Sequence, residues 1–155
     1  MKLKQWASVA EIASAIAVVV TLVILIMEIR ESNEVARADA YSELVRDLNS
    51  QAIAVAQDDR LNRIWQLYHS GEAATLSDED SARLAVLLRT TFRTYETAYY
   101  RMLYGTLGEA EWARFEEGSC YHRERQTEQL WDLAVISSVT SEFGVYLNDL
   151  CPLDR

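Results

Sequence analysis

The two histidines, His69 and His122, are the side chains whose type and spacing come nearest to a chemical site. A dinuclear carboxylate centre in a helical bundle needs Glu-x-x-His pairs on two helices. Gln66 precedes His69 by three residues and Ser119 precedes His122 by three, so neither histidine has that partner. Glu124 lies two positions after His122, which puts the two side chains on different helix faces. We therefore predict no metal site and interpret both histidines as surface or rim residues.

Other signatures of catalysis are also missing from the sequence. It contains no glycine-rich phosphate loop, no Gly-x-Ser-x-Gly turn and no His-Glu-x-x-His pair. Glu96 is interpreted as a structural partner of an arginine such as Arg93 or Arg89. We predict no catalytic residue, no cofactor and no enzymatic activity. An enzyme would need a deep pocket in which Glu96, arginines and a histidine converge.

The run FRTYETAYYRMLYG contains four of the eight tyrosines. Phe92, Tyr95 and Tyr99 recur at helical spacing, so we expect them in the core. Tyr100 and Tyr104 lie off this stripe. Because tyrosine is common at interfaces, we predict that these two side chains form a partner surface.

Cys120 and Cys151 are the only cysteines, and 31 positions separate them. Neither belongs to a Cys-x-x-Cys pair, which leaves a zinc or thioredoxin-type site without support. In a periplasmic domain they could form a disulfide that ties down the C-terminal tail. In the cytosol they would stay reduced and buried. The sequence leaves both alternatives open.

The composition suits one modest domain with an appendage. Half of the 155 residues are hydrophobic, which is enough for a core. The formal net charge is −9, and the 13 basic residues other than Lys2 and Lys4 are outnumbered by 24 acidic ones. Such a chain repels phosphate backbones, so we predict no nucleic-acid partner.

The segment EIASAIAVVVTLVILIME, from Glu11 to Glu28, holds sixteen uncharged residues between its two glutamates. As a helix those sixteen span about 24 Å, but the apolar character continues outward to Trp6. Residues 6–27 would span about 33 Å, enough for the ~30 Å hydrocarbon core of a bilayer. Trp6 would lie at the interface, where the two N-terminal lysines can reach the headgroups. We predict a single-pass membrane anchor with the lipid bilayer as a partner.

Two alternatives explain this segment less well. A secretion signal needs a cleavage site, and the nearest small-x-small pattern, at residues 36–38, lies well beyond Met27 amid charges. A core helix needs a polar face, whereas residues 16–27 are apolar nearly all round.

Basic residues are almost balanced across the two flanks, and the doubly basic N-terminal tail weakly favours a periplasmic domain.

Small side chains recur along one face of the anchor at spacings of three and four residues. In lipid, small residues let helix backbones approach closely, and hydroxyl groups can add hydrogen bonds between helices. We predict that this face packs against other transmembrane helices, from a second copy or from a larger complex. The alternative is that alanine is simply common in such helices. The predicted packing face comprises Ala7, Ala10, Glu11, Ser14, Ala17 and Thr21.

The scarcity of proline and the spacing of glycine predict an all-α fold. We expect the anchor to continue as one long helix over residues 6–56, packed with four or five shorter helices as a bundle. A break at Ser32 and Asn33 is the alternative, because both are weak helix formers. The flank and transmembrane anchor then occupy residues 1–29, and the extramembrane helical domain occupies residues 30–155.

Capping residues place the shorter helices. Asp58 or Asp59 caps a second helix that ends before Gly71, and Ser77 caps a third that ends before Gly105.

The remaining helices follow from the same rules. Thr106 begins a fourth helix, with Glu109 at the capping-box position, that ends before Gly118. A fifth spans residues 119–136, and Thr140 caps a last short helix.

Several segments together resemble a widespread group of small bacterial proteins in which an N-terminal membrane helix continues into an all-helical domain. These segments are AEIASAIAVVVTLVILIMEIRESN, DDRLNRIWQLYHSG, LSDEDSARLAVLLRTTFRTYETAYYRMLYGTLGEAEW and SEFGVYLNDL. The resemblance implies this architecture and a location in the bacterial inner membrane. It implies no activity and no functional residue.

These observations favour a membrane-anchored interaction or structural module, self-assembling or acting as an accessory subunit of a larger inner-membrane complex. The alternative is a ligand-binding or sensory module that signals through the continuous anchor helix. A cavity lined by Trp65, Trp112, Trp131 and tyrosines would favour that alternative.

Overall fold

A computed structural model describes the backbone of residues 2–126, 128–136 and 138–152. Side chains are described for these residues except 2–10, 12, 13, 128, 129, 133 and 136. All regular structure within this part of the chain is helical, which confirms the all-α prediction. The chain forms two compact units, Met1–Ala38 and Asp39–Arg155, and each is described by itself below.

Helix α1 comprises Lys2–Gln57 and is uninterrupted, as predicted. Ser32 and Asn33 do not break it, because two weak helix formers cost less than 1 kcal/mol each when their neighbours are good ones. The helix ends where Asp58 turns to an extended backbone and caps the next helix.

The large apolar side chains in the middle of the Met1–Ala38 unit are exposed to solvent. From Ile16 to Ile29 these side chains are 46–64% exposed, and their positions cover every side of the helix. We call this surface the apolar collar. Part of the predicted membrane span lies outside the residues whose side chains are described. Across the described residues, no helix is both long enough and apolar enough to cross a membrane.

The Asp39–Arg155 unit begins with the last part of α1 and helices α2, Asp59–His69, and α3, Asp78–Leu103. Asp58, not Asp59, caps α2 by accepting hydrogen bonds from the backbone amides of Arg60 and Leu61. Ser77 caps α3 as predicted. Gly71 and Gly105 follow these helices with φ of 81° and 73°, the left-handed conformation that glycine adopts without strain.

Helix α4, Glu109–Glu124, differs from the sequence prediction at both ends. Gly108, not Thr106, occupies its N-cap position. Gly118 does not end it, and the helix continues for six more residues. A Cβ atom at position 118 would lie 2.9 Å from the Tyr95 hydroxyl oxygen, so this glycine serves the close approach of α3 and α4.

The C-terminal segment forms α5, Glu128–Trp131, a π-helical turn η2, Asp132–Ile136, and α6, Ser141–Leu150. The predicted fifth helix over residues 119–136 is therefore wrong, because α4 ends at Glu124 with Arg125 as its C-cap and α5 begins at Glu128. Thr140 caps α6 as predicted, by accepting from the Phe143 amide. Glu96 of α3 also accepts a hydrogen bond from the Thr140 amide. Its predicted pairing with an arginine such as Arg93 or Arg89 stays a prediction.

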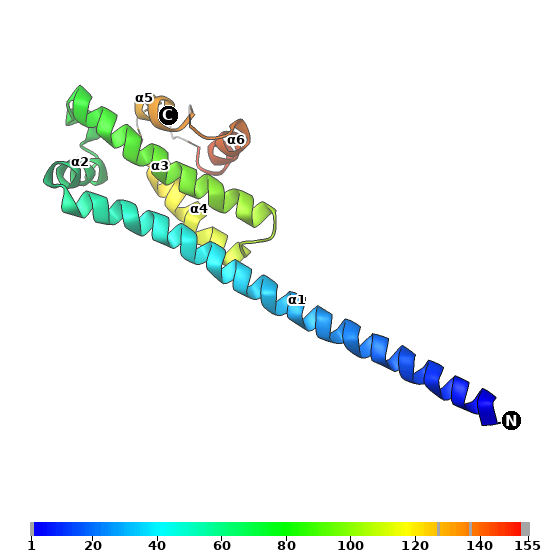
Figure 1. Ribbon diagram of the computed structural model, residues 1–155. Coiled ribbons are helices and arrows are strands. Elements are labelled where there is room, and N and C mark those ends of the chain that lie inside the picture. Colours follow the sequence, from blue (N-terminus) through cyan, green and yellow to red (C-terminus); the bar gives the residue numbers. More distant parts are fainter. Residues whose placement is uncertain (1, 127, 137, 153–155) are drawn as a thin grey trace. The chain divides into compact units, whose positions relative to one another are not determined.

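Helix α3 lies at the centre of the unit, in contact with α2, α4 and η2 (Figure 1). Its inward residues Leu84, Leu88 and Phe92 are fully buried. Phe92 packs edge-on against Trp131 of α5, with ring centroids 5.4 Å apart. Trp112, of α4, also belongs to this core.

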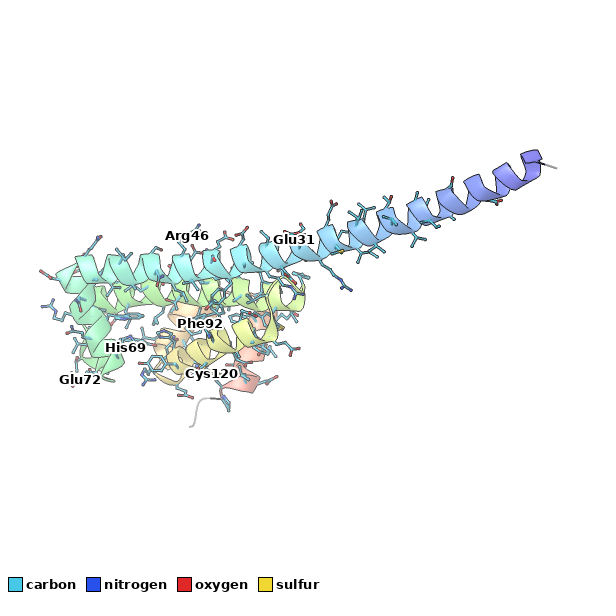
Figure 2. The ribbon with its side chains drawn as sticks, turned by 90° about the horizontal axis from the view of Figure 1, so that it is seen from below. Glu31, Arg46, His69, Glu72, Phe92 and Cys120 are labelled. Atoms are coloured by element: carbon cyan, nitrogen blue, oxygen red, sulfur yellow. A yellow bond between two sulfur atoms is a disulfide. The ribbon has the colours of Figure 1, made fainter. Side chains whose placement is uncertain are left out.

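Three cross-links hold the outer helices to this core. Arg101 of α3 donates to the Ala40 carbonyl oxygen and pairs with Glu43, both of α1. A disulfide joins Cys120 of α4, labelled in Figure 2, to Cys151 after α6.

The third cross-link starts from a buried guanidinium. Arg123 of α4 lies 3.7 Å from the centre of the Trp131 ring and donates to Asn148 of α6 at 3.0 Å. It thereby ties α4 to both α5 and α6.

Candidate functional site

A pocket of about 330 Å³ lies between four helices of the Asp39–Arg155 unit. The C-terminal turns of α1 form one wall, α2 and α3 form two others, and α4 contributes a single residue. Its size falls at the lower end of the roughly 300–1,000 Å³ range typical of small-molecule sites. The lining residues are Leu48, Gln51, Ala52, Val55, Ala56, Asn62, Trp65, Leu87, Thr91, Tyr95 and His122.

Helical periodicity explains how α1 and α3 line the pocket. Leu48, Ala52 and Val55 are three or four residues apart and therefore share a face of α1. Leu87 and Thr91 are spaced in the same way on α3. Exposed residues of α1, including Ala52, form the rim through which the pocket meets solvent.

Two polar contacts involve lining residues, and the first connects the α1 and α3 walls of the pocket. The Thr91 hydroxyl lies 2.8 Å from Gln51 Oε1 and 3.0 Å from the Leu87 carbonyl oxygen, and it donates its one proton to this pair. Within α2, Gln66 Nε2 donates to Asn62 Oδ1 at 2.9 Å. Both lining carboxamides therefore already use their oxygen atoms as acceptors.

His122 is the most perturbed titratable group in the pocket. It is only 8% exposed, so the prediction that both histidines are surface or rim residues is wrong for His122, while His69 is half-buried. Burial, together with the nearby His69 and Arg125, lowers the pKa of His122 to about 4. The imidazole is therefore neutral at physiological pH.

An aromatic cluster buries this imidazole. Tyr68 of α2 stacks on His122 with ring centroids 5.8 Å apart, and Trp65 lies 5.7 Å away. Figure 2 labels two members of the cluster that come from different helices: His69 from α2 and Phe92 from α3. Burial also raises the pKa of Tyr68, which keeps its hydroxyl protonated.

The chemistry available in the pocket is that of neutral hydrogen-bonding groups on an apolar wall. A base whose pKa is about 4 accepts protons poorly near neutral pH, so His122 is poorly matched to general-base catalysis. Within the described part of the chain, no group of three or more His, Cys, Asp or Glu side chains is arranged to hold a metal ion.

The predicted packing face is only partly described. The side chains of Ala7 and Ala10 lie outside the described residues. Glu11, Ser14, Ala17 and Thr21 are all exposed.

A hydrogen bond lies in the described part of this face. The Thr21 hydroxyl donates to the Ala17 carbonyl oxygen at 2.9 Å, so its proton is used within α1 while its oxygen can still accept a bond.

The two predicted partner-surface tyrosines differ in exposure. Tyr104 is 78% exposed, whereas Tyr100 is half-buried and its hydroxyl contacts Thr140 at 2.9 Å and Glu142 at 3.2 Å. Their rings stack with centroids 6.2 Å apart. Tyr104 therefore presents a ring to solvent, while Tyr100 is held against α6.

Sequence reasoning missed most of the pocket. Of the three tryptophans proposed for a cavity only Trp65 lines it, since Trp112 and Trp131 are buried in the core. The one available signal was the pair of small residues Ala52 and Ala56 on the pocket rim of α1, where bulkier side chains would have closed the space. Comparison of the chain with protein-family models, curated proteins and solved structures finds no match.

Proposed function

We propose that this chain is a non-catalytic, membrane-anchored interaction module of the bacterial inner membrane. Its helical domain either self-assembles or serves as an accessory subunit of a larger membrane complex. The observation that carries the proposal is the apolar collar, whose large side chains lie exposed on every side of α1. Such a surface is stable only when lipid or other proteins cover it.

Lipid explains the collar better than a protein groove does. A groove buries one face of a helix and leaves a polar face in water, but residues 16–27 offer no polar face beyond Thr21. The apolar sequence also extends to Trp6, which gives a segment of about 33 Å as a helix.

The disulfide supports a periplasmic location for the helical domain. Disulfides persist in oxidising compartments such as the periplasm and are rare in the cytosol. The Cys120–Cys151 bond therefore favours the side of the membrane that the doubly basic N-terminal tail favours as well.

Membrane integration is tested by washing membranes with alkaline carbonate and by fusing alkaline phosphatase, which is active only in the periplasm, to the C-terminus. We expect the chain to remain in the pellet and the fusion to be active. Release by carbonate contradicts the anchor. An inactive fusion on a carbonate-resistant chain overturns only the side of the membrane.

Association is tested by gentle detergent extraction followed by native mass spectrometry. A homo-oligomer of defined number supports self-assembly, and stoichiometric co-purification with other subunits supports the accessory role. Recovery of a monomer alone at every detergent concentration contradicts both.

The packing face is tested by Ala10→Leu and Ser14→Leu, which place bulk where helices would meet. Val19→Phe is the control, because it adds bulk on the opposite face of α1. We expect the first two variants to lose association and the control to keep it, with all three remaining in the membrane. Equal association in all variants rules out this face as the contact.

A second candidate function, ligand binding, is favoured by the pocket around His122. The α1 residues that line it belong to the same continuous helix as the apolar collar. A ligand that orders this part of α1 could therefore bias the anchor helix, as expected of a sensory module. The test is whether a pocket ligand raises the melting temperature of the full chain.

A further inference from the structure

We propose that the pocket binds a neutral, largely apolar small molecule carrying a hydroxyl group, with the hydroxyl donating its proton to His122 Nε2. This inference rests on the second candidate function and specifies the class of ligand. It follows from three properties of the lining residues: their charge, the tautomer of His122 and the amide donors on the other walls.

The lining residues carry no formal charge at neutral pH. A quarter of all residues in the chain are Asp, Glu, Lys or Arg, yet none of these types lines the pocket, and His122 is neutral there. A carboxylate or an ammonium group in the pocket would lose water without gaining an ionic partner, which is strongly unfavourable. The pocket is therefore selective for neutral molecules.

The hydrogen bonds of Tyr68 determine which nitrogen of His122 carries the proton. The Tyr68 hydroxyl donates its single proton to the His122 carbonyl oxygen at 3.0 Å. The same hydroxyl oxygen lies 3.2 Å from His122 Nδ1. Because its proton is already used, the Tyr68 oxygen must accept from Nδ1–H, and Nε2 is left with a lone pair.

His122 Nε2 is therefore an acceptor that lacks a donor among the described residues. A ligand hydroxyl supplies that donor. The hydroxyl oxygen can in turn accept hydrogen bonds from the walls. The side-chain oxygens of Gln51 and Asn62 accept bonds from Thr91 and Gln66, so the amide N–H groups are the atoms with which these two residues can bind a ligand. The remaining lining residues, such as Leu48, Val55 and Trp65, suit an apolar body.

Three probes on one aromatic skeleton test this assignment with the full-length chain in detergent, by isothermal titration calorimetry against a matched detergent blank. Para-cresol is neutral and carries the hydroxyl. Para-methylanisole is its methyl ether and cannot donate. Para-toluate is the corresponding anion at neutral pH. We expect para-cresol to bind up to about tenfold more tightly than the ether, since one hydrogen bond changes affinity by about that factor. We expect no detectable binding of para-toluate, because the lining offers its charge no ionic partner.

Variants locate the binding. His122→Phe keeps an aromatic ring and removes Nε2, so para-cresol should weaken to the level of the ether while the ether is unchanged. His69→Phe is the matched control, because His69 belongs to the same aromatic cluster but does not line the pocket, and para-cresol should bind it as it binds the parent chain. Ala52→Phe fills the pocket from its exposed rim and should abolish binding of both probes.

The outcomes separate the failures. Equal affinity for para-cresol and its ether, lost in Ala52→Phe, overturns the hydroxyl assignment and leaves ligand binding in place. Preference for para-toluate overturns the assignment of a neutral ligand. Absence of binding by all three probes overturns this inference and removes the support for the second candidate function. Should His122→Phe fail to fold, the probe series on the parent chain and on Ala52→Phe still decides among these results.

Discussion

Leu22 and Leu88 are the same residue type in two helices of one chain, and they meet opposite surroundings. Leu22, in the Met1–Ala38 unit, is 53% exposed, whereas Leu88, in the Asp39–Arg155 unit, is fully buried. Helix propensity does not distinguish them. The difference lies in their neighbours. Helix α3 has an exposed polar face, so its apolar face can be buried, whereas the collar has no polar face. The exposed polar residues of α3 include Arg83, Thr90, Arg93 and Thr97. A helix with one apolar face can bury that face in a protein core, whereas a helix that is apolar all round must be covered by lipid or by other proteins.

The largest expected effect comes from breaking this comparison at its two leucines. Leu88→Ala should lower the free energy of unfolding by roughly 3–5 kcal/mol, because it leaves a cavity in a packed core. Leu22→Ala deletes the same atoms from an exposed site and should cost less than about 0.5 kcal/mol. Urea unfolding of the full chain in detergent, followed by near-UV circular dichroism, measures both. Similar losses at the two positions would mean that the Met1–Ala38 unit has a packed core of its own.

Removal of the disulfide should have the next largest effect, and only in the Asp39–Arg155 unit. The two cysteines are 31 positions apart, so Cys120→Ser combined with Cys151→Ser should cost about 3.5 kcal/mol, mainly by freeing the unfolded chain. Reduction of the parent chain should give the same loss. Equal urea midpoints for the parent chain and the double variant would show that the bond contributes nothing to stability.

Acidification should destabilise the Asp39–Arg155 unit through its histidines, because both histidines of the chain lie in that unit. The folded pKa of His122 is about 4, below the ordinary value of 6.5, so the unfolded chain binds this proton first. Its contribution to stability is complete above pH 6.5 and is lost as the pH falls toward 4. The loss should reach roughly 2–3 kcal/mol at about pH 4.5.

His122→Phe isolates this effect, since other groups titrate in the same window. Burial and Arg125 also lower the pKa of His69, which contributes in the same direction. The difference in unfolding free energy between neutral and acidic pH should shrink in His122→Phe and change much less in His69→Phe. An unchanged pH dependence in His122→Phe would show that the buried imidazole is not its source.

The smallest effect concerns a single serine in each unit. Ser77→Ala removes the N-cap of α3 and should cost about 1 kcal/mol. Ser14→Ala, at an exposed site within α1, should leave the unfolding free energy within about 0.5 kcal/mol of the parent value. Thermal or urea unfolding resolves the difference between these variants, and a larger loss at Ser14 would indicate that its hydroxyl has a partner.

Local signals were sufficient for most of the helices. Ser77 and Thr140 were recognised as caps because a serine or threonine before an apolar run satisfies amide groups that the helix leaves unpaired. The two glycines with positive φ, Gly71 and Gly105, were recognised because few other residues adopt that conformation. These rules concern neighbours in sequence, and the structure follows them.

Two local boundaries were predicted wrongly, the start of α4 and the fifth helix, and the other errors involve residues whose role depends on a distant partner. Gly118 was interpreted as a helix end, although it lies inside α4 and the close approach of the Tyr95 side chain leaves no room for a Cβ atom there. His122 was interpreted as a rim residue, although Tyr68 and Trp65 of α2 bury it. The pocket draws residues from four helices, and no local pattern encodes how those helices pack.

The contact between Gly118 and Tyr95 also limits how this chain can vary in evolution. Any side chain at position 118 meets the Tyr95 hydroxyl oxygen at 2.9 Å, so the wall of the pocket and the interior of α4 cannot change independently. Loss of the hydroxyl through Tyr95→Phe removes the nearest atom and leaves the ring carbon at 3.3 Å, a tight but more tolerable neighbour. Gly118→Ala should therefore be much less harmful after Tyr95→Phe than before it. The order in which the two substitutions arise decides whether the chain passes through a poorly folded intermediate.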